Sequence, residues 1–158
     1  LCEVAGIEPP ASNEGTSFLP VLTGERPRIR DVLYGAYCGG QRPGIRAVRR
    51  GDWKLIEYES GTGERHTQLF NLRDNPLELL AEHHDPAIKA VSRVAPLADQ
   101  RSLAADPAQA ARRAALEADL LAEMQRLEDP FRFSYQPADE GAAPAEVVPA
   151  TQSVQPGG

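Results

Sequence analysis

The chain has 158 residues, of which 41% are hydrophobic and 6% aromatic, and it carries a formal net charge of −6. This length supports one small core, while 13 glycines and 14 prolines predict that a sizeable part is loop or tail. No apolar run approaches the roughly 18 residues of a membrane helix and no leader pattern is present, so no membrane partner is expected. The pI of about 5.1, without an aromatic ladder or nucleic-acid-binding motif, argues against nucleic acid.

Basic residues concentrate in one stretch of this acidic chain. Residues 26–54 hold eight basic side chains against two acidic ones, a net charge of +6, which leaves −12 for the remainder. The basic members are Arg26, Arg28, Arg30, Arg42, Arg46, Arg49, Arg50 and Lys54. Such a patch raises the local concentration of anions. The alternative is a solvated sheet face whose charges pair with acidic residues elsewhere.

The N-terminal pattern predicts the end of a helix. Residues 1–7 carry apolar positions from the first residue onward, and Pro9 then removes the amide that a continuing helix needs. We therefore expect the chain to be a fragment of a longer protein. A short apolar run between Gly15 and Gly24 predicts one further helical turn, packed on the core.

Four strand patterns follow. Residues 31–37 alternate in a way that places Val32, Tyr34 and Ala36 on one face. Residues 45–50 and 53–58 predict a hairpin that reverses at Gly51-Asp52, because glycine tolerates positive φ. After a turn at residues 60–63, residues 67–72 predict the fourth strand.

A long helix is predicted near the C-terminus. Asp106 is a good N-cap, Pro107 fits the first helical position, and the composition favours helix to about Leu127. An apolar stripe at helical spacing predicts the face that covers the sheet. Its members are Leu116, Leu120, Met124 and Leu127. A second capped start is predicted at Asp85-Pro86, and the sequence from Gln136 onward is expected to be disordered.

Candidate catalytic or metal residues are sparse. Cys2 and Cys38 form no disulfide or metal framework, and adjacent His83 and His84 before a helix cap are expected in an exposed loop. His66 is expected to pack across strands. Glu57 and Glu59 are expected on an exposed strand face, and nothing makes them an acid/base pair.

Several short motifs occur in a fixed order along residues 1–130. They are LCEVAGIE at 1–8, GTSFLPVLTG at 15–24, RDVLYG at 30–35, RAVR at 46–49, GDWKLI at 51–56, LFNL at 69–72 with Asn75-Pro76, and LAADP at 103–107. In this order the chain resembles the C-terminal part of the sulfatase family. It departs from the family pattern at Glu14 and Asn71, where aspartate is more common, and in a longer segment at 77–102.

The resemblance implies hydrolysis of sulfate esters or sulfamates by an alkaline-phosphatase-like α/β domain. In that family a formylglycine, made from a Cys/Ser-x-Pro-x-Arg motif, works beside a calcium ion, a pairing suited to holding charge on sulfuryl oxygens. Residues 38–42 space a cysteine and an arginine correctly, but Gly40 stands where the motif needs proline. We therefore expect neither formylglycine nor calcium, and no catalytic residue or activity, from this chain alone.

The resemblance also suggests where a substrate meets the chain. The small C-terminal sheet borders the catalytic pocket in similar enzymes, and sulfated substrates are anionic. We expect Gln41, Arg42 and Arg46 to contact the substrate outside the reacting sulfuryl group, because arginine binds sulfate or carboxylate through two donors. The alternative is that Arg42 and Arg46 only pair with acidic residues or solvent. The partners implied are an anionic sulfated small molecule or saccharide and a catalytic domain that precedes this chain.

The sequence therefore predicts an α+β fold, with a small four-stranded antiparallel sheet packed against a C-terminal helix. Residues 1–25 are expected to end the catalytic domain, residues 26–135 to form the C-terminal subdomain, and residues 136–158 to be a tail. The alternatives are a related phosphate-ester hydrolase and a non-catalytic α+β binding module. The resemblance also fits a periplasmic or extracellular enzyme.

Overall fold

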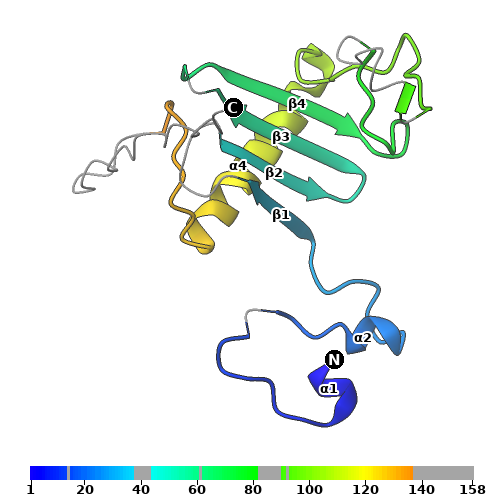
Figure 1. The fold of residues 1–158 in the computed structure, drawn as a ribbon, viewed down its shortest axis with the longest axis vertical. Coiled ribbons are helices and arrows are strands. Elements are labelled where there is room, and N and C mark those ends of the chain that lie inside the picture. Colours follow the sequence, from blue (N-terminus) through cyan, green and yellow to red (C-terminus); the bar gives the residue numbers. More distant parts are fainter. Residues whose placement is uncertain (14, 38–43, 61, 82–89, 92, 137–158) are drawn as a thin grey trace, which may run out of the picture.

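The fold was described from a computed structural model, in which residues 1–13, 15–37, 44–60, 62–81, 90–91 and 93–136 are placed. Its elements are α1 (Cys2–Ala5), α2 (Leu19–Leu22), β1 (Val32–Tyr37), β2 (Gly44–Arg50), β3 (Trp53–Glu59), β4 (Arg65–Asn71), the short 3-10 helix η2 (Pro107–Gln109) and α4 (Ala110–Arg126). The strands form one antiparallel sheet in the order β1-β2-β3-β4, and α4 crosses one face of it (Figure 1). The predicted α+β class is confirmed.

Strand register gives the sheet two different faces. Val48 of β2 pairs with Tyr34 of β1 and with Leu55 of β3, and Leu55 pairs in turn with Leu69 of β4. Side chains alternate along a strand, so these four point to the same face. Val48, Leu55 and Leu69 are buried there beneath α4, which packs over β1, β2 and β3. The reversal between β2 and β3 uses Gly51 at φ 58°, as the sequence predicts.

The predicted helical region begins at Pro107 with the 3-10 helix η2, continues as α4, and buries three of the four apolar residues predicted for its stripe. The Asp106 side chain accepts a hydrogen bond of 2.9 Å from the Ala108 amide, which satisfies a free donor at the helix start. Leu116, Leu120 and Met124 are buried. Leu127, the predicted fourth member of the stripe, is 46% exposed because the helix ends at Arg126.

Residues 128–136, which we call the C-terminal strap, complete the core. Phe131 and Phe133 are each 1% exposed and join the cluster formed by the sheet and α4. Their rings meet edge to face with centroids 5.0 Å apart. Gly44 lies so close to Phe131 that a β-carbon at this position would overlap the ring. The start of β2 therefore requires glycine, because a larger side chain would collide with the Phe131 ring of the strap.

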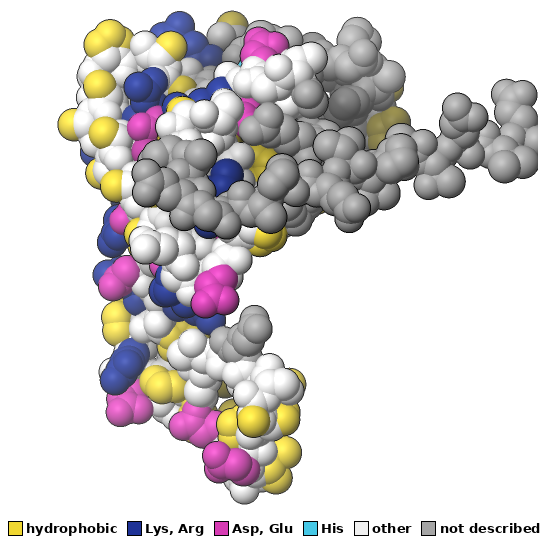
Figure 2. Space-filling view, turned by 90° about the vertical axis from the view of Figure 1, so that its left-hand side faces the viewer, with side chains coloured by type: hydrophobic (Ala, Val, Ile, Leu, Met, Phe, Trp, Pro, Cys, Tyr) yellow, Lys and Arg dark blue, Asp and Glu magenta, His cyan; other side chains and the backbone are white. Residues whose placement is uncertain are grey.

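The N-terminal segment lies apart from the sheet (Figure 1). Neither α1 nor α2 has a buried residue, and Phe18 and Leu22 are 52% and 67% exposed. Hydrophobic side chains gather at this end of the molecule (Figure 2). The prediction of a helical turn at α2 is confirmed, but the prediction that it packs on the core is wrong for the described chain, because no sheet face reaches it.

The outer edge of β4 is covered by the segment that leads to α4. The Leu103 amide donates to the Leu69 carbonyl at 2.9 Å, and the Ser102 hydroxyl accepts from the Leu69 amide at 3.2 Å. Asn75 closes the turn after β4, since its side chain exchanges hydrogen bonds with both backbone groups of Leu79.

The helix start predicted at Asp85-Pro86 lies outside the described residues. In the described part of the chain, no helix is long and apolar enough to cross a membrane.

Candidate functional site

The described basic side chains of residues 26–54 lie in different surroundings. Arg46 lies in the middle of β2 and points beneath α4, whereas Arg49 and Arg50 lie at its far end. Arg50 forms a two-nitrogen ion pair with Asp119 of α4, at 2.6 and 2.7 Å. Lys54 binds both carboxylate oxygens of Glu78 at 2.7 and 2.8 Å. Much of the local positive charge is therefore neutralised by acidic residues elsewhere, as the alternative interpretation anticipated.

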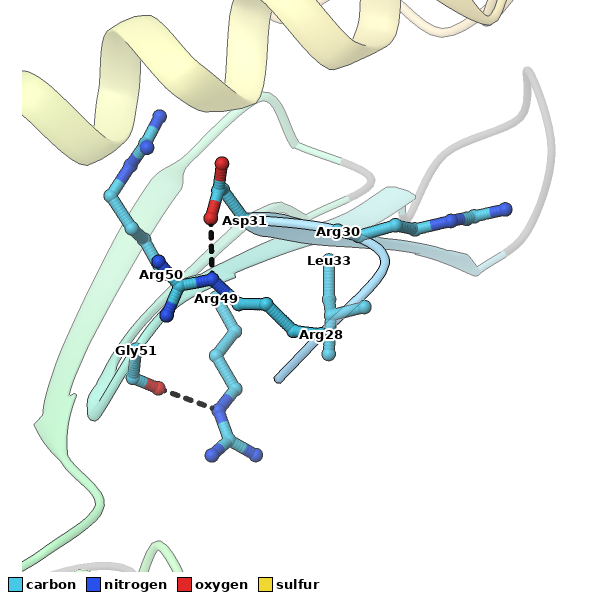
Figure 3. A pocket seen from close by; sticks show the side chains of 7 residues that line it. All are labelled: Arg28, Arg30, Asp31, Leu33, Arg49, Arg50 and Gly51. Carbon is cyan, nitrogen blue, oxygen red and sulfur yellow. Dashed lines mark hydrogen bonds and ion pairs between the residues drawn. The ribbon is translucent and has the colours of Figure 1, made fainter. Parts of the chain in front are cut away.

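An arginine-lined cavity of about 580 Å³ lies where β1 begins and the β2–β3 hairpin turns (Figure 3). It is lined by Arg28, Arg30, Asp31, Leu33, Arg49, Arg50 and Gly51. Asp31 accepts from Arg28 at 2.6 Å, the Gly51 carbonyl accepts from Arg49 at 2.9 Å, and Arg30 points away from the other arginines. Within the described ranges, Arg30 and Arg49 have no carboxylate partner. The cavity can attract an anion, and Asp31, the carboxylate among its lining residues, is paired with Arg28.

Arg46 is placed in the interior. Its side chain is 0% exposed, and Nε and Nη2 bind the Asp129 carboxylate of the strap at 2.6 and 2.7 Å. Nη1 donates to the carbonyls of Tyr37 and Ile45, at 2.8 and 2.9 Å, and the guanidinium lies 4.5 Å from the centre of the Phe131 ring. The arginine thus ties the end of β1 and the start of β2 to the strap. This geometry gives Arg46 a structural role, while its predicted substrate contact stays a prediction.

Asp129 and Tyr34 complete this buried cluster. The Tyr34 hydroxyl donates to Asp129, and the Phe131 amide donates to the same carboxylate at 2.8 Å. Burial alone would raise the pKa of Asp129, but the hydrogen bonds from Arg46 and Tyr34 outweigh it and lower the pKa below its ordinary value. Burial and the neighbouring Asp129 raise the pKa of Tyr34. Both shifts favour an ionised carboxylate beside a neutral phenol at neutral pH.

A second buried cluster involves the two strand glutamates. Glu57 and Glu59 are both 0% exposed, so the prediction of exposed positions is wrong. Glu57 accepts from Arg65 and, at 3.0 Å, from the Tyr135 hydroxyl, while Glu59 accepts from the Ser134 amide at 2.7 Å and from its hydroxyl. The strap supplies Ser134 and Tyr135 as donors to these carboxylates, and β4 supplies Arg65. The two glutamates are therefore buried although the alternation of the strand predicts exposure.

The remaining candidates contribute no catalytic centre to the described chain. His66 stacks on Tyr58 with ring centroids 4.8 Å apart, which confirms the predicted cross-strand packing. In the parts of the chain that the structure describes, no three His, Cys, Asp or Glu side chains gather where a metal ion could bind. These residues therefore do not fit a calcium site. The other sequence candidates, Cys38, Gln41, Arg42, His83 and His84, lie outside the described residues.

Sequence reasoning missed the role of the strap. One signal for it was present, because Phe131, Phe133 and Tyr135 alternate with polar residues in the two-residue period of an extended segment. Phe133 and Tyr135 stack with centroids 5.4 Å apart, and Arg65 lies 4.1 Å from the Tyr135 ring centre. The strap therefore holds together the end of the sheet from which the connection between β1 and β2 emerges.

Comparisons with known proteins agree with this architecture. No protein-family model matches the chain. The chain is 32% identical over 111 residues to the Delta 4,5-hexuronate-2-O-sulfatase of Bacteroides thetaiotaomicron, across 67% of this chain and 21% of that protein. The solved structure of BT4656 in complex with its substrate D-glucosamine-2-N,6-O-disulfate matches with a TM-score of 0.55 and 17% identity, across 80% of this chain and 22% of that one. The chain thus spans about a fifth of the length of each.

Proposed function

We infer that this chain, which has the sequence and fold of the C-terminal region of a sulfatase, belongs to an enzyme that hydrolyses sulfate esters. The observation that carries this proposal is the 32% identity to a hexuronate sulfatase over 111 residues. The similarity of the fold to the solved structure of BT4656, with a TM-score of 0.55, supports it.

The substrate class we propose is a sulfated saccharide. One relative is a hexuronate-2-O-sulfatase by name, and the structural neighbour was solved with a disulfated glucosamine. Such ligands carry several negative charges, and residues 26–54 hold a net charge of +6 in an otherwise acidic chain. Acidic residues elsewhere neutralise part of this charge, and the cavity lined by Arg28, Arg30, Arg49 and Arg50 keeps positive side chains that can attract an anionic substrate.

We assign the chemical step to the part of the enzyme outside this chain. Among the described residues, no three His, Cys, Asp or Glu side chains gather where a metal ion could bind. In the proposed enzyme, a preceding α/β domain supplies formylglycine and calcium, and these 158 residues alone are inactive. The same assignment would hold for a related phosphate-ester hydrolase, so the substrate has to be tested directly.

We propose that this chain forms part of the rim of the substrate pocket. Gln41 and Arg42 lie in the sequence between Tyr37, which ends β1, and Gly44, which begins β2. Arg46 binds the carbonyls of Tyr37 and Ile45 and so holds the two strands that flank this connection. We propose that Gln41 and Arg42 contact the saccharide, and that Arg46 supports their position from beneath the sheet.

The test uses the complete enzyme with three substrates: a sulfated disaccharide, a small aryl sulfate and an aryl phosphate. Turnover of both sulfates, but not of the phosphate, is the expected result. Turnover of the phosphate alone would indicate the phosphatase alternative, and no turnover of any substrate would favour a non-catalytic binding module.

The rim assignment is tested with Arg42→Ala in the same enzyme. This variant should raise KM for the disaccharide by about tenfold, the loss of one charge-assisted contact, and leave the aryl sulfate unaffected. Arg73→Ala is the matched control, because the Arg73 side chain is 77% exposed and pairs only at the surface with Asp52. Equal effects of both variants, or equal effects on both sulfates, would remove Arg42 from the rim.

A further inference from the structure

Two side chains of the strap anchor β2 beside the connection that enters it from β1. The Asp129 carboxylate binds the Arg46 guanidinium through two nitrogen atoms, at 2.6 and 2.7 Å. The Phe131 ring lies so close to Gly44, the first residue of β2, that no β-carbon fits between them. The strap therefore holds β2 at the end where the connection reaches it.

Arg46 extends this anchoring to β1. Its Nη1 atom donates to the Tyr37 carbonyl at 2.8 Å and to the Ile45 carbonyl at 2.9 Å. Tyr37 is the last residue of β1, and it pairs directly with Ile45 across the two strands. One buried guanidinium therefore fixes both strand ends that flank the connection.

The Asp129 carboxylate determines where that Nη1 atom points. A guanidinium is planar, so binding of both carboxylate oxygens through Nε and Nη2 leaves Nη1 in a set direction. The carboxylate is itself held in place, because the Tyr34 hydroxyl and the Phe131 amide donate to it. A neutral side chain of the same size at position 129 would release the guanidinium from this orientation.

We propose that Asp129, acting through Arg46, is a positioning residue for the substrate rim. It fixes the ends of β1 and β2, and so the place from which Gln41 and Arg42 reach the saccharide. This inference rests on the proposed function, because it concerns the rim of the same site. Asp129 is 6% exposed and lies in the strap, so its effect on the substrate is indirect. A displacement of about 1 Å in a group that positions substrate can cost about 100-fold in rate, so the loss of such an anchor should be measurable.

The test compares two substrates in the complete enzyme, a sulfated disaccharide and a small aryl sulfate. Asp129→Asn should raise the ratio of the two KM values, disaccharide over aryl sulfate, by about tenfold, the loss expected for one charge-assisted contact at the rim. Leu116→Ala is the matched control, because it also destabilises the buried core but its apolar side chain cannot orient Arg46. This control should leave the ratio as in the parent enzyme. Both variants are assayed at a temperature at which circular dichroism shows them to be folded.

A milder variant keeps the proposal testable if Asp129→Asn does not fold. Tyr34→Phe removes one donor to the carboxylate and retains both nitrogen contacts from Arg46. It should raise the same ratio by about two- to threefold. In a background that carries Gln41→Ala and Arg42→Ala, neither substitution should raise the ratio further, because the contacts that the strap positions are already absent.

Hydrogen exchange in the complete enzyme gives a readout that does not depend on turnover. The amides of residues 37–45 should exchange faster in Asp129→Asn than in Leu116→Ala. Equal exchange and equal KM ratios in these two variants would overturn the proposal and show that the strap contributes stability alone. A ratio that still rises when Gln41 and Arg42 are already alanine would also overturn it. Turnover of sulfates by the parent enzyme tests the proposed function separately.

Discussion

The guanidinium of Arg46 binds the carboxylate of Asp129 through two nitrogen atoms, at 2.6 and 2.7 Å, although the residues are 83 positions apart in sequence. Both are buried, and the pair joins the middle of β2 to the strap. Removal of one partner leaves the other charge buried without compensation, which typically costs more than the intact pair contributes. This relationship makes the strap an integral part of the folded subdomain.

Asp129→Asn should therefore destabilise the chain strongly. The expected loss in the free energy of unfolding is about 3–5 kcal/mol, the usual cost of breaking a buried ion pair. Urea unfolding of the 158-residue chain measures it. Asp52→Asn is the matched control, because it breaks the exposed Asp52–Arg73 pair and should cost at most about 1 kcal/mol. Similar losses for the two variants would mean that the Arg46–Asp129 pair contributes no more than a surface contact.

The same carboxylate should make stability depend on acid pH. The pKa of Asp129 lies below its ordinary value of 3.8 despite burial, owing to hydrogen bonds from Arg46 and Tyr34. A group whose pKa is lowered by folding stabilises the fold above its unfolded pKa, and this contribution is lost as pH falls through the folded pKa. The free energy of unfolding should therefore decrease as the pH falls below the ordinary carboxyl pKa of 3.8. In Asp129→Asn the decrease with falling pH should be smaller. Parallel pH profiles for the two proteins would contradict this assignment.

The stripe on α4 offers a test of the helix-on-sheet packing. Leu116 is 3% exposed, so Leu116→Ala should leave a cavity and cost about 2–5 kcal/mol. Leu127→Ala removes the same atoms from a residue that is 46% exposed and should cost much less. Thermal or urea unfolding of both variants gives the comparison. An unchanged unfolding curve for Leu116→Ala would contradict the packing of α4.

Close contact between β2 and the strap predicts that Gly44 tolerates no larger side chain. Gly44→Ala would place its new methyl group against the Phe131 ring, and such overpacking typically costs about 1–3 kcal/mol. The loss should shrink in a Phe131→Ala background, since the obstructing ring is then absent. A double-mutant cycle by urea unfolding measures this coupling. Additive losses would show that the glycine is required for another reason.

Truncation separates the strap from the tail that follows it. Removal of residues 137–158 should leave the unfolding transition unchanged. A chain that ends at residue 127 also loses Phe131, Phe133 and the Asp129 carboxylate that binds Arg46, which exposes the core, so it should not fold cooperatively. Circular dichroism during thermal unfolding distinguishes the two. A cooperative transition in the shorter chain would show that the strap is dispensable.

Much of the fold could be predicted from local pattern. Gly51 marks the hairpin between β2 and β3, and Asp106-Pro107 marks the start of the helical region. The spacing of Leu116, Leu120 and Met124 identifies the face of α4 that is buried. These signals depend on neighbours within one or two turns of the chain, which is why sequence reasoning recovers them.

The candidate site could not be predicted to the same degree. Arg46, Glu57 and Glu59 have the two-residue alternation of an ordinary strand, which does not reveal what covers each face. Their partners lie in the strap, far along the chain. Arg46 and Asp129 are 83 positions apart, Glu57 and Tyr135 are 78 apart, and Glu59 and Ser134 are 75 apart. Local pattern therefore predicts exposure for Glu57 and Glu59, although Tyr135 and Ser134, from the end of the subdomain, bind them.

By itself, the sequence determined the order of strands and helix, the turn residues and the resemblance to sulfatases, because each rests on short-range spacing. Only the tertiary structure decided that Arg46 is buried against Asp129 and that the strap closes the core. The physical reason is that burial depends on which distant segment packs on a surface. The partner of a buried charge is chosen by the assembled fold, not by neighbours along the chain.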